Sequence, residues 1–362
     1  MKDLYIGLMS GTSCDGVDGV IAEFSDDHRV TIVAYAHIDF DDDLRCRLNQ
    51  LQQTHFSSDP FHLMAISAND LVDYYARVVS QLCQTAKLRS ADITAIGCHG
   101  QTIRHHPQSG YSIQMNNPAR LVEKTGIRVI ADWRNRDIAA GGEGAPLVPL
   151  FHQWLFGTPD WHRVIINLGG IANLTDLSSN LGFDIGPANT LMDTWIMKHR
   201  HQPYDAGGDW AASGEVIEPL LVRLLSTPFF HQQPPKSTGR DMFSLAWLEG
   251  HLTGDEKPED IQATLLVLTA QIVSDAVLGL KKRPDQIFLC GGGVYNKTLR
   301  QKLDQLLAVN TMSTAEIGLD PMQVEATAFA WLARQTLMHQ PGNLPEVTGA
   351  IGPRVLGAIY PV

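Results

Sequence analysis

The sequence predicts an α/β protein built from two similar halves. Each half begins with three short apolar runs typical of strands and continues with alternating helical and strand-like segments. Each half also places a glycine-rich loop between its first two predicted strands, at residues 10–16 and 167–173. The length of 362 residues is sufficient for two domains with a sizeable core.

The first half contains three strand-like runs, a long helical stretch and a second group of strands. The elements expected there are strands at 3–9, 17–24 and 29–38, a helix at 60–87, strands at 93–100 and 111–115, a helix at 118–125 and a strand at 127–132. The second half repeats this plan from residue 163, although residue identity between the halves is low. The elements expected there are strands at 163–170, 171–177 and 181–186, a helix at 259–282, a strand at 287–290 and a helix at 321–339.

The helix expected at 259–282 is indicated by the spacing of its apolar residues. Its apolar residues recur near helical spacing, at Ile261, Leu265, Leu268, Ile272 and Leu280. A proline at position 284 follows, as expected of a helix stop.

The segment 132–149 is rich in Gly, Ala and Pro, which suits a crossing or hinge between domains. A plain surface loop is the alternative interpretation. The expected domains are therefore 1–137 and 138–362, with the end of the chain packing back on the first domain. The architecture favoured is two duplicated domains facing a cleft.

Composition excludes several classes of partner. A net charge of -11 argues against general attraction to nucleic acid or to anionic membranes. Five cysteines without a CxxC pair suit buried thiols in a reducing compartment better than disulfides or a zinc site. The N-terminus does not resemble a signal peptide, and no apolar stretch is expected to span a membrane. The sequence therefore predicts a cytoplasmic protein, and it leaves a homodimer open.

The loop at 10–16 is a candidate phosphate-binding site. Successive backbone N–H groups in a tight glycine-rich loop converge on an anion without side-chain bulk. Thr12 and Ser13 add hydroxyl donors, and Asp15 and Asp18 are candidates for holding Mg²⁺ through water. A long hairpin without a ligand is the alternative.

Two further glycine loops make the pattern more specific. The loop at 167–173 occupies the matching place in the other half, and the loop at 290–296 follows a strand and precedes a helix. There the backbone can approach an adenosine or its α-phosphate, although a lone glycine run more often marks close packing. Two hairpin loops and one strand-to-helix loop match the nucleotide clamp of the actin, Hsp70 and sugar-kinase superfamily, in which ATP lies between two duplicated domains of RNase H-like fold. The sequence has neither GxxxxGK[ST] nor a GxGxxG opening a strand–helix unit.

Asp184 is the candidate catalytic base. It lies in the turn GFDIGPAN at 182–189, just after the second phosphate loop, where a carboxylate can take a proton from a nucleophile. A helix-capping aspartate is the alternative.

Three other positions suit a cleft. Arg134 follows a predicted strand, and a solvated arginine is its alternative. Glu325 precedes an apolar helical stretch, where it either faces the cleft or is a favourable acid in the first helical turn. The histidines around His99 have no metal-binding spacing and, with Gln101, suit a polar ligand better.

The motifs together resemble those of the 1,6-anhydro-N-acetylmuramic acid kinase family, from one end of the chain to the other. In chain order they are SGTSCDGVD, GCHGQTIRHHP, ADWRNRDIAAGG, NLGGIANLT, GFDIGPAN, PPKSTGRDMF, CGGGVYN and NLPEVTGA. The chain departs from the family pattern at Ile185 and Ala188, where Thr and Gly are more usual, and at Glu143, which replaces a Gln.

The resemblance implies a phosphotransferase with an alcohol acceptor, ATP and Mg²⁺. Members of the family open the anhydro bridge with water and phosphorylate O6 from ATP, which gives N-acetylmuramic acid 6-phosphate and ADP in bacterial cell-wall recycling. The loops and the resemblance assign ATP binding to Gly11, Thr12, Ser13, Cys14, Asp15, Gly16, Val17, Asp18, Asn167, Gly169, Gly170, Asn173, Gly291, Gly292 and Gly293. They assign the sugar to Arg134, Glu325, His99 and Gln101, and catalysis to Asp184. The alternatives are a kinase of the same superfamily acting on a free sugar hydroxyl and an actin- or Hsp70-like ATP-gated interaction module.

Overall fold

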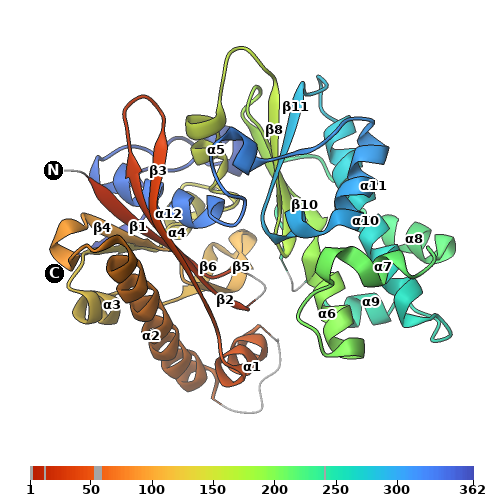
Figure 1. Ribbon diagram of the computed structural model, residues 1–362, viewed down its shortest axis with the longest axis horizontal. Helices are drawn as coiled ribbons and strands as arrows, with labels where there is room; N and C mark the ends of the chain where they lie inside the picture. Colours follow the sequence, from red (N-terminus) through yellow and green to blue (C-terminus); the bar gives the residue numbers. More distant parts are fainter. Residues whose placement is uncertain (1–2, 12–13, 53–58, 240–241) are drawn as a thin grey trace. The chain divides into compact units, whose positions relative to one another are not determined.

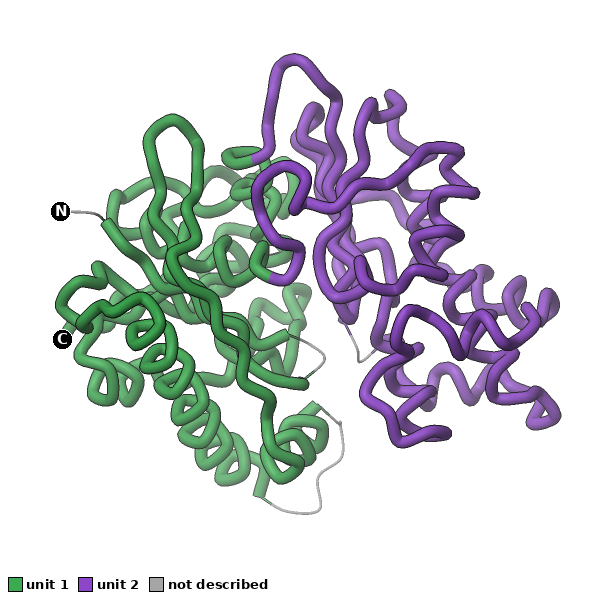
Figure 2. The backbone as a smooth tube through the Cα atoms, viewed as in Figure 1, with its two compact units in different colours: residues 1–155, 323–362 green, residues 156–322 purple. Residues whose placement is uncertain are grey.

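The chain forms two compact units. The computed structural model describes residues 3–11, 14–52, 59–239 and 242–362. Unit 1 consists of Met1–Leu155 and Gln323–Val362, and unit 2 of Phe156–Met322 (Figure 2).

Unit 1 contains a six-stranded sheet of order β13-β7-β4-β1-β2-β3 and a two-stranded sheet of β5 and β6 (Figure 1). Its strands are β1 (Leu4–Met9), β2 (Gly16–Phe24), β3 (Val30–Asp39), β4 (Ala95–Cys98), β5 (Gln101–His106), β6 (Tyr111–Met115), β7 (Val129–Ala131) and β13 (Ala358–Tyr360). Its helices are α1 (Asp42–Leu51), α2 (Pro60–Ala86), α3 (Pro118–Thr125), α4 (Asn135–Ile138), α5 (Pro149–Phe156, which ends at the unit boundary), α12 (Val324–Leu337) and α13 (Pro345–Thr348).

Unit 2 contains a five-stranded sheet of order β10-β9-β8-β11-β12. Its strands are β8 (Arg163–Leu168), β9 (Ile171–Asp176), β10 (Leu181–Pro187), β11 (Gln286–Cys290) and β12 (Met312–Ser313). Its helices are α6 (Asn189–Arg200), α7 (Asp209–Ala212), α8 (Glu218–Leu225), α9 (Leu245–Glu249), α10 (Pro258–Leu278) and α11 (Lys297–Leu307).

The two main sheets share one topology, which confirms the predicted α/β class and its duplicated plan. In each sheet the first three strands form an antiparallel meander, with the third strand at the edge. The fourth strand then lies parallel to the first on its other side, and a fifth lies parallel to the fourth. Each meander therefore presents its first turn, the site of a predicted phosphate loop, beside the end of the fourth strand.

Helix α12 packs against β1, β2 and β4 at the centre of the first sheet. Its close approach depends on Gly7 of β1 and Gly97 of β4, which are paired in the sheet. A Cβ atom on Gly7 would lie 1.8 Å from the carbonyl oxygen of Ala326, and one on Gly97 would lie 2.0 Å from that of Phe329. Any side chain at either position would push the helix off the sheet, because packed interiors leave no room for the added atoms.

The domain boundaries differ from the predicted ones. The predicted boundary between residues 137 and 138 falls inside unit 1, and so does the segment 132–149 that was interpreted as a hinge. The physical reason is that Asp137 ties this segment to the end of the chain through hydrogen bonds from Asn343 and Thr348. The crossings occur instead at residues 155–156 and 322–323, and everything from α12 onward belongs to unit 1.

The expectation that no segment has the length and apolarity of a membrane span is wrong for α10. Within the described residues, this helix alone is long and apolar enough, with 21 residues and a mean hydropathy of 1.6 in its most apolar window. Of that window 72% is buried, and the helix packs against α6, α7, α8, α11 and β10. Its composition is that of a core helix.

Candidate active site

A row of polar residues crosses the sheet of unit 2. Asp184 of β10 pairs with Asn173 of β9, which pairs with Asn167 of β8, which in turn lies beside Cys290 of β11. Residues opposite each other on neighbouring strands point to the same face, and adjacent strands lie about 4.8 Å apart. The register therefore brings three of the predicted site residues onto one face, next to the loop that begins at Gly291.

The backbone fixes the position of the Asp184 carboxylate. The side chain is 7% exposed, and its Oδ2 accepts a hydrogen bond from the N–H of Thr238 at 3.0 Å. The N–H of Asp184 donates to the carbonyl of Lys236 at 3.2 Å, so the loop 236–238 runs alongside β10. The Lys236 ammonium donates to the carbonyl of Phe229, and burial lowers its pKa while the charge of Asp184 opposes this shift. Asp184 is thus a buried carboxylate with a fixed orientation.

The second glycine loop is joined to the start of α6. The carbonyl of Gly169 accepts a hydrogen bond from the N–H of Asn189, and the carbonyl of Gly170 accepts from the N–H groups of Ala188 and Thr190. The amide side chain of Asn189 also donates to the carbonyl of Leu168. The β8–β9 turn is therefore held in one conformation by the residues that follow Asp184.

The third glycine loop packs against the second. Gly291 has φ +79°, and a Cβ atom there would lie 2.4 Å from the side-chain oxygen of Asn167. A Cβ atom on Gly293 would lie 2.6 Å from Cβ of Leu168. Close packing, the alternative left open for a glycine run, therefore applies at these two positions. Gly292 differs because it is exposed and its Cβ direction is open, with Asn189 no nearer than 4.0 Å.

The first glycine loop is described only at its ends, because Thr12 and Ser13 lie outside the described residues. The carbonyl of Gly11 accepts hydrogen bonds from the N–H of Cys14 and, at 3.0 Å, from the side-chain amide of Gln101. Gln101 is fully buried and is thus the residue of β5 that anchors this loop.

At the C-terminal end of this loop, some residues are buried and one is exposed. Those of Cys14 and Val17 are fully buried in the core of unit 1, so only their backbone is available to a ligand. At Gly16, a Cβ atom would lie 2.6 Å from the carbonyl oxygen of Ile38. Asp15 is exposed.

Asp18 is engaged by two side chains of β3. Its Oδ1 accepts hydrogen bonds from the hydroxyl of Tyr35 at 2.7 Å and from Nδ1 of His37 at 2.9 Å, while Nε2 of His37 faces Asp39. The hydrogen bond to Asp18 is the main reason that the pKa of His37 rises to about 9. His37 is therefore a cation at neutral pH.

The acidic residues near the first loop fit a water-mediated metal better than a directly bound one. Among the described residues no group of three or more His, Cys, Asp or Glu is arranged to hold a metal ion. Mg²⁺ retains most of its waters and takes one or two carboxylates together with phosphate oxygens. Asp15 is exposed and Asp18 is already paired, which suits contact through water.

Arg134 and His99 form a hydrogen-bonded pair in unit 1. Nη2 of Arg134 lies 3.0 Å from Nε2 of His99, and Nη1 donates to the carbonyl of Gly144 at 2.8 Å. A guanidinium only donates, so Nε2 is the acceptor and the proton of the neutral imidazole is on Nδ1. Burial, and then the charge of Arg134, lower the pKa of His99 to about 3, so this ring is neutral at physiological pH.

Helix α12 brings Glu325 to the same region. The ring of His99 contacts that of Phe329, with centroids 4.7 Å apart. Phe329 lies four residues after Glu325, on the same face of the helix. Glu325 is half-buried in the first turn of α12, as predicted. Arg134 and His99 therefore lie together in unit 1, and Glu325 lies one helical turn before the phenylalanine that His99 contacts.

The three departures from the family pattern have ordinary surroundings. Ile185 and Ala188 are buried in the core of unit 2, on either side of Gly186. The side chain of Glu143 accepts a hydrogen bond from that of Gln108 at 2.9 Å.

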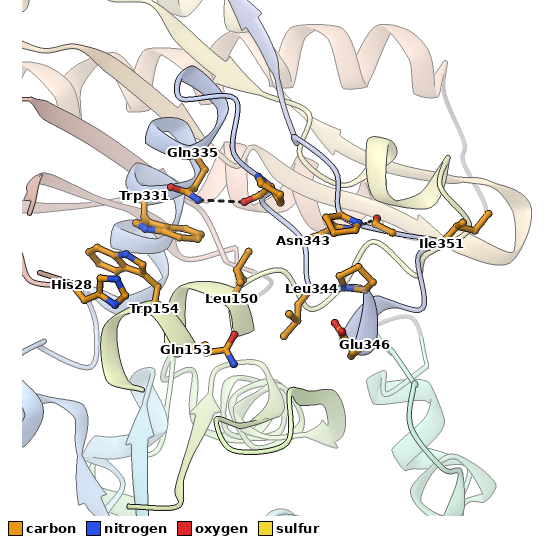
Figure 3. A pocket seen from close by; sticks show the side chains of 14 residues that line it. His28, Leu150, Gln153, Trp154, Trp331, Gln335, Asn343, Leu344, Glu346 and Ile351 are labelled. Atoms are coloured by element: carbon orange, nitrogen blue, oxygen red, sulfur yellow. Dashed lines mark hydrogen bonds between the residues drawn. The ribbon is translucent and has the colours of Figure 1, made fainter. Parts of the chain in front are cut away.

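A cavity of about 710 Å³ lies elsewhere in unit 1 (Figure 3). Trp154 and Trp331 stand at one end of it and Asn343 and Glu346 towards the other. None of the site residues predicted from the sequence lines it, so the cavity is separate from the candidate site.

Three groups that contact the predicted site residues or their hydrogen-bond partners were not predicted from the sequence. These are the backbone of 236–238, the cation His37 and the buried carboxylate of Asp137. The first lies in the motif PPKSTGRDMF, which contributed to the family resemblance but indicated no particular role for these residues. The other two are single residues inside regular segments, which carry no sequence signal.

The fold and the loops define a duplicated α/β protein of the actin-like ATPase class, with a glycine loop in the first hairpin of each unit. A family model described as anhydro-N-acetylmuramic acid kinase matches residues 3–362. The anhydro-N-acetylmuramic acid kinase of Nitrosospira multiformis is 50% identical, over 99% of this chain and 98% of its own. That of Nitrosomonas europaea is 49% identical over 99% of both. The chain belongs to this family and is a kinase, a phosphotransferase with an alcohol acceptor.

Similar solved structures are much more distant. The activator of 2-hydroxyisocaproyl-CoA dehydratase from Clostridium difficile, with bound ADPNP, has a TM-score of 0.47 at 16% identity, over 93% of this chain and 96% of its own. A ROK family glucokinase from Streptomyces griseus, in complex with glucose and AMPPNP, has a TM-score of 0.41 at 13% identity, over 92% and 99%.

The pair of His37 and Asp18 predicts a pH-dependent part of the stability. The pKa of His37 is about 9 in the folded chain and lies above the ordinary value of 6.5. The pair therefore stabilises the fold fully below about pH 6.5 and loses this effect as the pH rises through about 9. In thermal unfolding, His37→Gln should lower the midpoint at about pH 6, and the difference from the parent should shrink towards about pH 10. The exposed His62→Gln serves as control; an equal deficit for His37→Gln at both pH values would contradict the prediction.

Proposed function

We propose that this chain is an ATP-dependent kinase that opens the 1,6-anhydro bridge of anhydro-N-acetylmuramic acid with water and phosphorylates O6, which gives N-acetylmuramic acid 6-phosphate and ADP. The observation that carries the proposal is the buried, backbone-held carboxylate of Asp184 on the sheet face that leads to two glycine loops. Family membership over residues 3–362 supports the choice of substrate. Cell-wall sugar recycling in the cytoplasm is proposed as the setting; a homodimer stays a prediction.

The reaction requires a base that activates water, and not one that deprotonates a sugar hydroxyl. An anhydro sugar has no free O6 hydroxyl to deprotonate, because O6 is bonded to the anomeric carbon. Asp184 takes a proton from a water molecule, whose oxygen attacks that carbon as in an inverting glycosidase. The bond between the anomeric carbon and O6 breaks, O6 bonds to the γ-phosphorus, and ADP leaves. Because phosphorus captures the departing O6, no separate general acid is needed.

The surroundings of Asp184 suit the role of a base. The hydrogen bond from the N–H of Thr238 to Oδ2 holds the carboxylate in one orientation. Burial to 7% exposure limits access of bulk solvent, and the backbone contacts fix the direction of attack. Asn167 and Asn173 add neutral amides on the same face, which can bind polar ligand atoms without competing for the proton.

ATP is proposed to lie against the glycine loops, whose N–H groups would stabilise the charge on the phosphates. The ATP-binding residues proposed are those named from the sequence, among which Gly292 is exposed and has open surroundings. Mg²⁺, held through water near Asp15 and Asp18, would supply further neutralisation of the phosphate charge.

The sugar-binding role is proposed for the group in unit 1. N-acetylmuramic acid carries a carboxylate and an acetamide, and a guanidinium such as that of Arg134 suits a carboxylate through two parallel hydrogen bonds. His99 is neutral and holds the guanidinium rather than neutralising it. Glu325 adds a carboxylate for the polar groups of the sugar, whereas Gln101 is fully buried and supports the site by holding the carbonyl of Gly11.

The choice of substrate separates this proposal from a kinase that acts on a free hydroxyl. We expect phosphorylation of anhydro-N-acetylmuramic acid, and little or none of the reducing N-acetylmuramic acid, because only the first supplies O6 as a leaving group. The measurement is ADP formation with each sugar, together with the mass of the product. Phosphorylation of the reducing sugar alone would favour the alternative kinase. ATP turnover of similar rate without any sugar would favour an ATP-gated module.

Asp184→Asn tests the base directly. The amide preserves size but cannot accept the proton, so kcat should fall by about 10²- to 10⁴-fold. Affinities for ATP and sugar, measured by calorimetry, should stay within about threefold, because neither ligand depends on the negative charge for binding. Asp176→Asn makes the same change at the far end of β9, where Asp176 binds His162, and should keep kcat. Near-normal turnover by Asp184→Asn would remove Asp184 from the mechanism.

A further inference from the structure

The carboxylate of Asp137 is fully buried and bound entirely by donors of unit 1. Oδ2 accepts a hydrogen bond from the N–H of Gly144 at 2.8 Å. Oδ1 accepts from the side-chain amide of Asn343 at 2.7 Å and from the hydroxyl of Thr348 at 2.8 Å. Among the described residues, no cation forms an ion pair with it. A buried carboxylate is costly unless several donors converge on it, so these contacts form a tightly specified centre.

The loop around Asp137 admits only glycine at two positions. A Cβ atom on Gly142 would lie 2.2 Å from Oδ2 of Asp137. Gly144 has φ +67°, and a Cβ atom there would lie 2.7 Å from the side chain of Ile138. The loop is therefore wrapped closely around the carboxylate, and the peptide groups of Gly144 have one available placement.

The carbonyl of Gly144 connects the loop around Asp137 to Arg134. It accepts the hydrogen bond from Nη1 of Arg134 at 2.8 Å, while Nη2 binds His99. Asp137 thus fixes the N–H of Gly144, and the carbonyl of the same residue fixes one side of the guanidinium. A guanidinium recognises a carboxylate through a planar fork, so a small rotation removes one of its two hydrogen bonds to the ligand.

We infer that Asp137 is a positioning residue for the sugar site, acting on Arg134 through Gly144. The inference rests on the sugar-binding role proposed for Arg134. Asn343 holds Oδ1 of this carboxylate from the segment that follows α12, and Thr348 adds a second donor to the same oxygen, away from Gly144. Asn343 also donates to the carbonyl of Gly352 at 3.4 Å, beside the cavity of Figure 3.

The consequence is a selective loss of sugar affinity. Asp137→Asn places an amide N–H₂ among three donors, so one contact is lost and the loop must shift. We expect the KM for anhydro-N-acetylmuramic acid to rise by roughly tenfold, the size of one lost hydrogen bond to a charged group. The KM for ATP should stay within about twofold, because Asp137 reaches no glycine loop of the ATP site. KM does not depend on the fraction of enzyme that is folded, so lower stability alone does not produce this pattern.

Thr348→Val is the matched control, because it removes a donor from the same carboxylate on the side away from Gly144. It should lower the unfolding midpoint and leave the sugar KM within about twofold. Gly144→Ala is the second variant, should Asp137→Asn fail to fold. Its Cβ atom displaces the carbonyl that holds Arg134 and leaves Asp137 in place, so the sugar KM should again rise alone.

A double-mutant cycle closes the test. In an Arg134→Ala background, adding Asp137→Asn should change the sugar KM by less than about twofold, because the residue it positions is gone. An unchanged sugar KM in Asp137→Asn or Gly144→Ala, an equal rise in Thr348→Val, or a full rise in the Arg134→Ala background would overturn the inference. If Arg134→Ala itself leaves the sugar KM unchanged, the proposed role of Arg134 fails with it, and that single variant identifies the cause.

Discussion

The contact of α12 with bare backbone on β1 and β4 is the constraint on which the organisation of unit 1 depends. Gly7 and Gly97 leave the carbonyls of Ala326 and Phe329 room to approach the sheet, and a side chain at either glycine would meet them within 2.0 Å. Because this helix begins where unit 2 ends, its docking returns the last forty residues to unit 1. Those residues supply Phe329, whose ring contacts that of His99, and the two side chains that hold Asp137.

In unit 2, the register of the strands determines which polar side chains share one face of the sheet. A slip of one residue in β10 would turn Asp184 to the other face of the sheet and away from Asn173 and Asn167. The glycine loops then close around the ends of these strands, since Gly291 and Gly293 permit contacts with Asn167 and Leu168 that no side chain would allow. Both units thus use glycine in the same way. Glycine lets two backbone segments approach closely, and polar side chains next to these contacts are held in fixed positions.

Much of this was predictable from the sequence. The apolar runs gave the order of the meander strands, the helix at 60–87 agrees with α2 to one residue, and the helix at 118–125 agrees with α3. The unit boundaries were not predictable, because the glycine content of 132–149 resembles a linker while the tie from Asp137 to Asn343 spans 206 positions. Strand β5 was hidden in a polar motif, and β13 has only three residues. Helix α1 was missed although Leu44, Leu48 and Leu51 recur at helical spacing. Asp184 was predicted as a site residue from its motif. Its partner Thr238 was not, because it donates a backbone N–H, which every residue except proline has.

The central claim is that water activated by Asp184 attacks the anomeric carbon while O6 of the sugar accepts the phosphoryl group. The direct measurement is a short reaction in ¹⁸O-labelled water, with the product fragmented by mass spectrometry and reducing N-acetylmuramic acid incubated in parallel to correct for exchange. We expect one labelled oxygen at the anomeric position and none in the phosphate ester. A label in the phosphate ester, or an unlabelled sugar product, would contradict it.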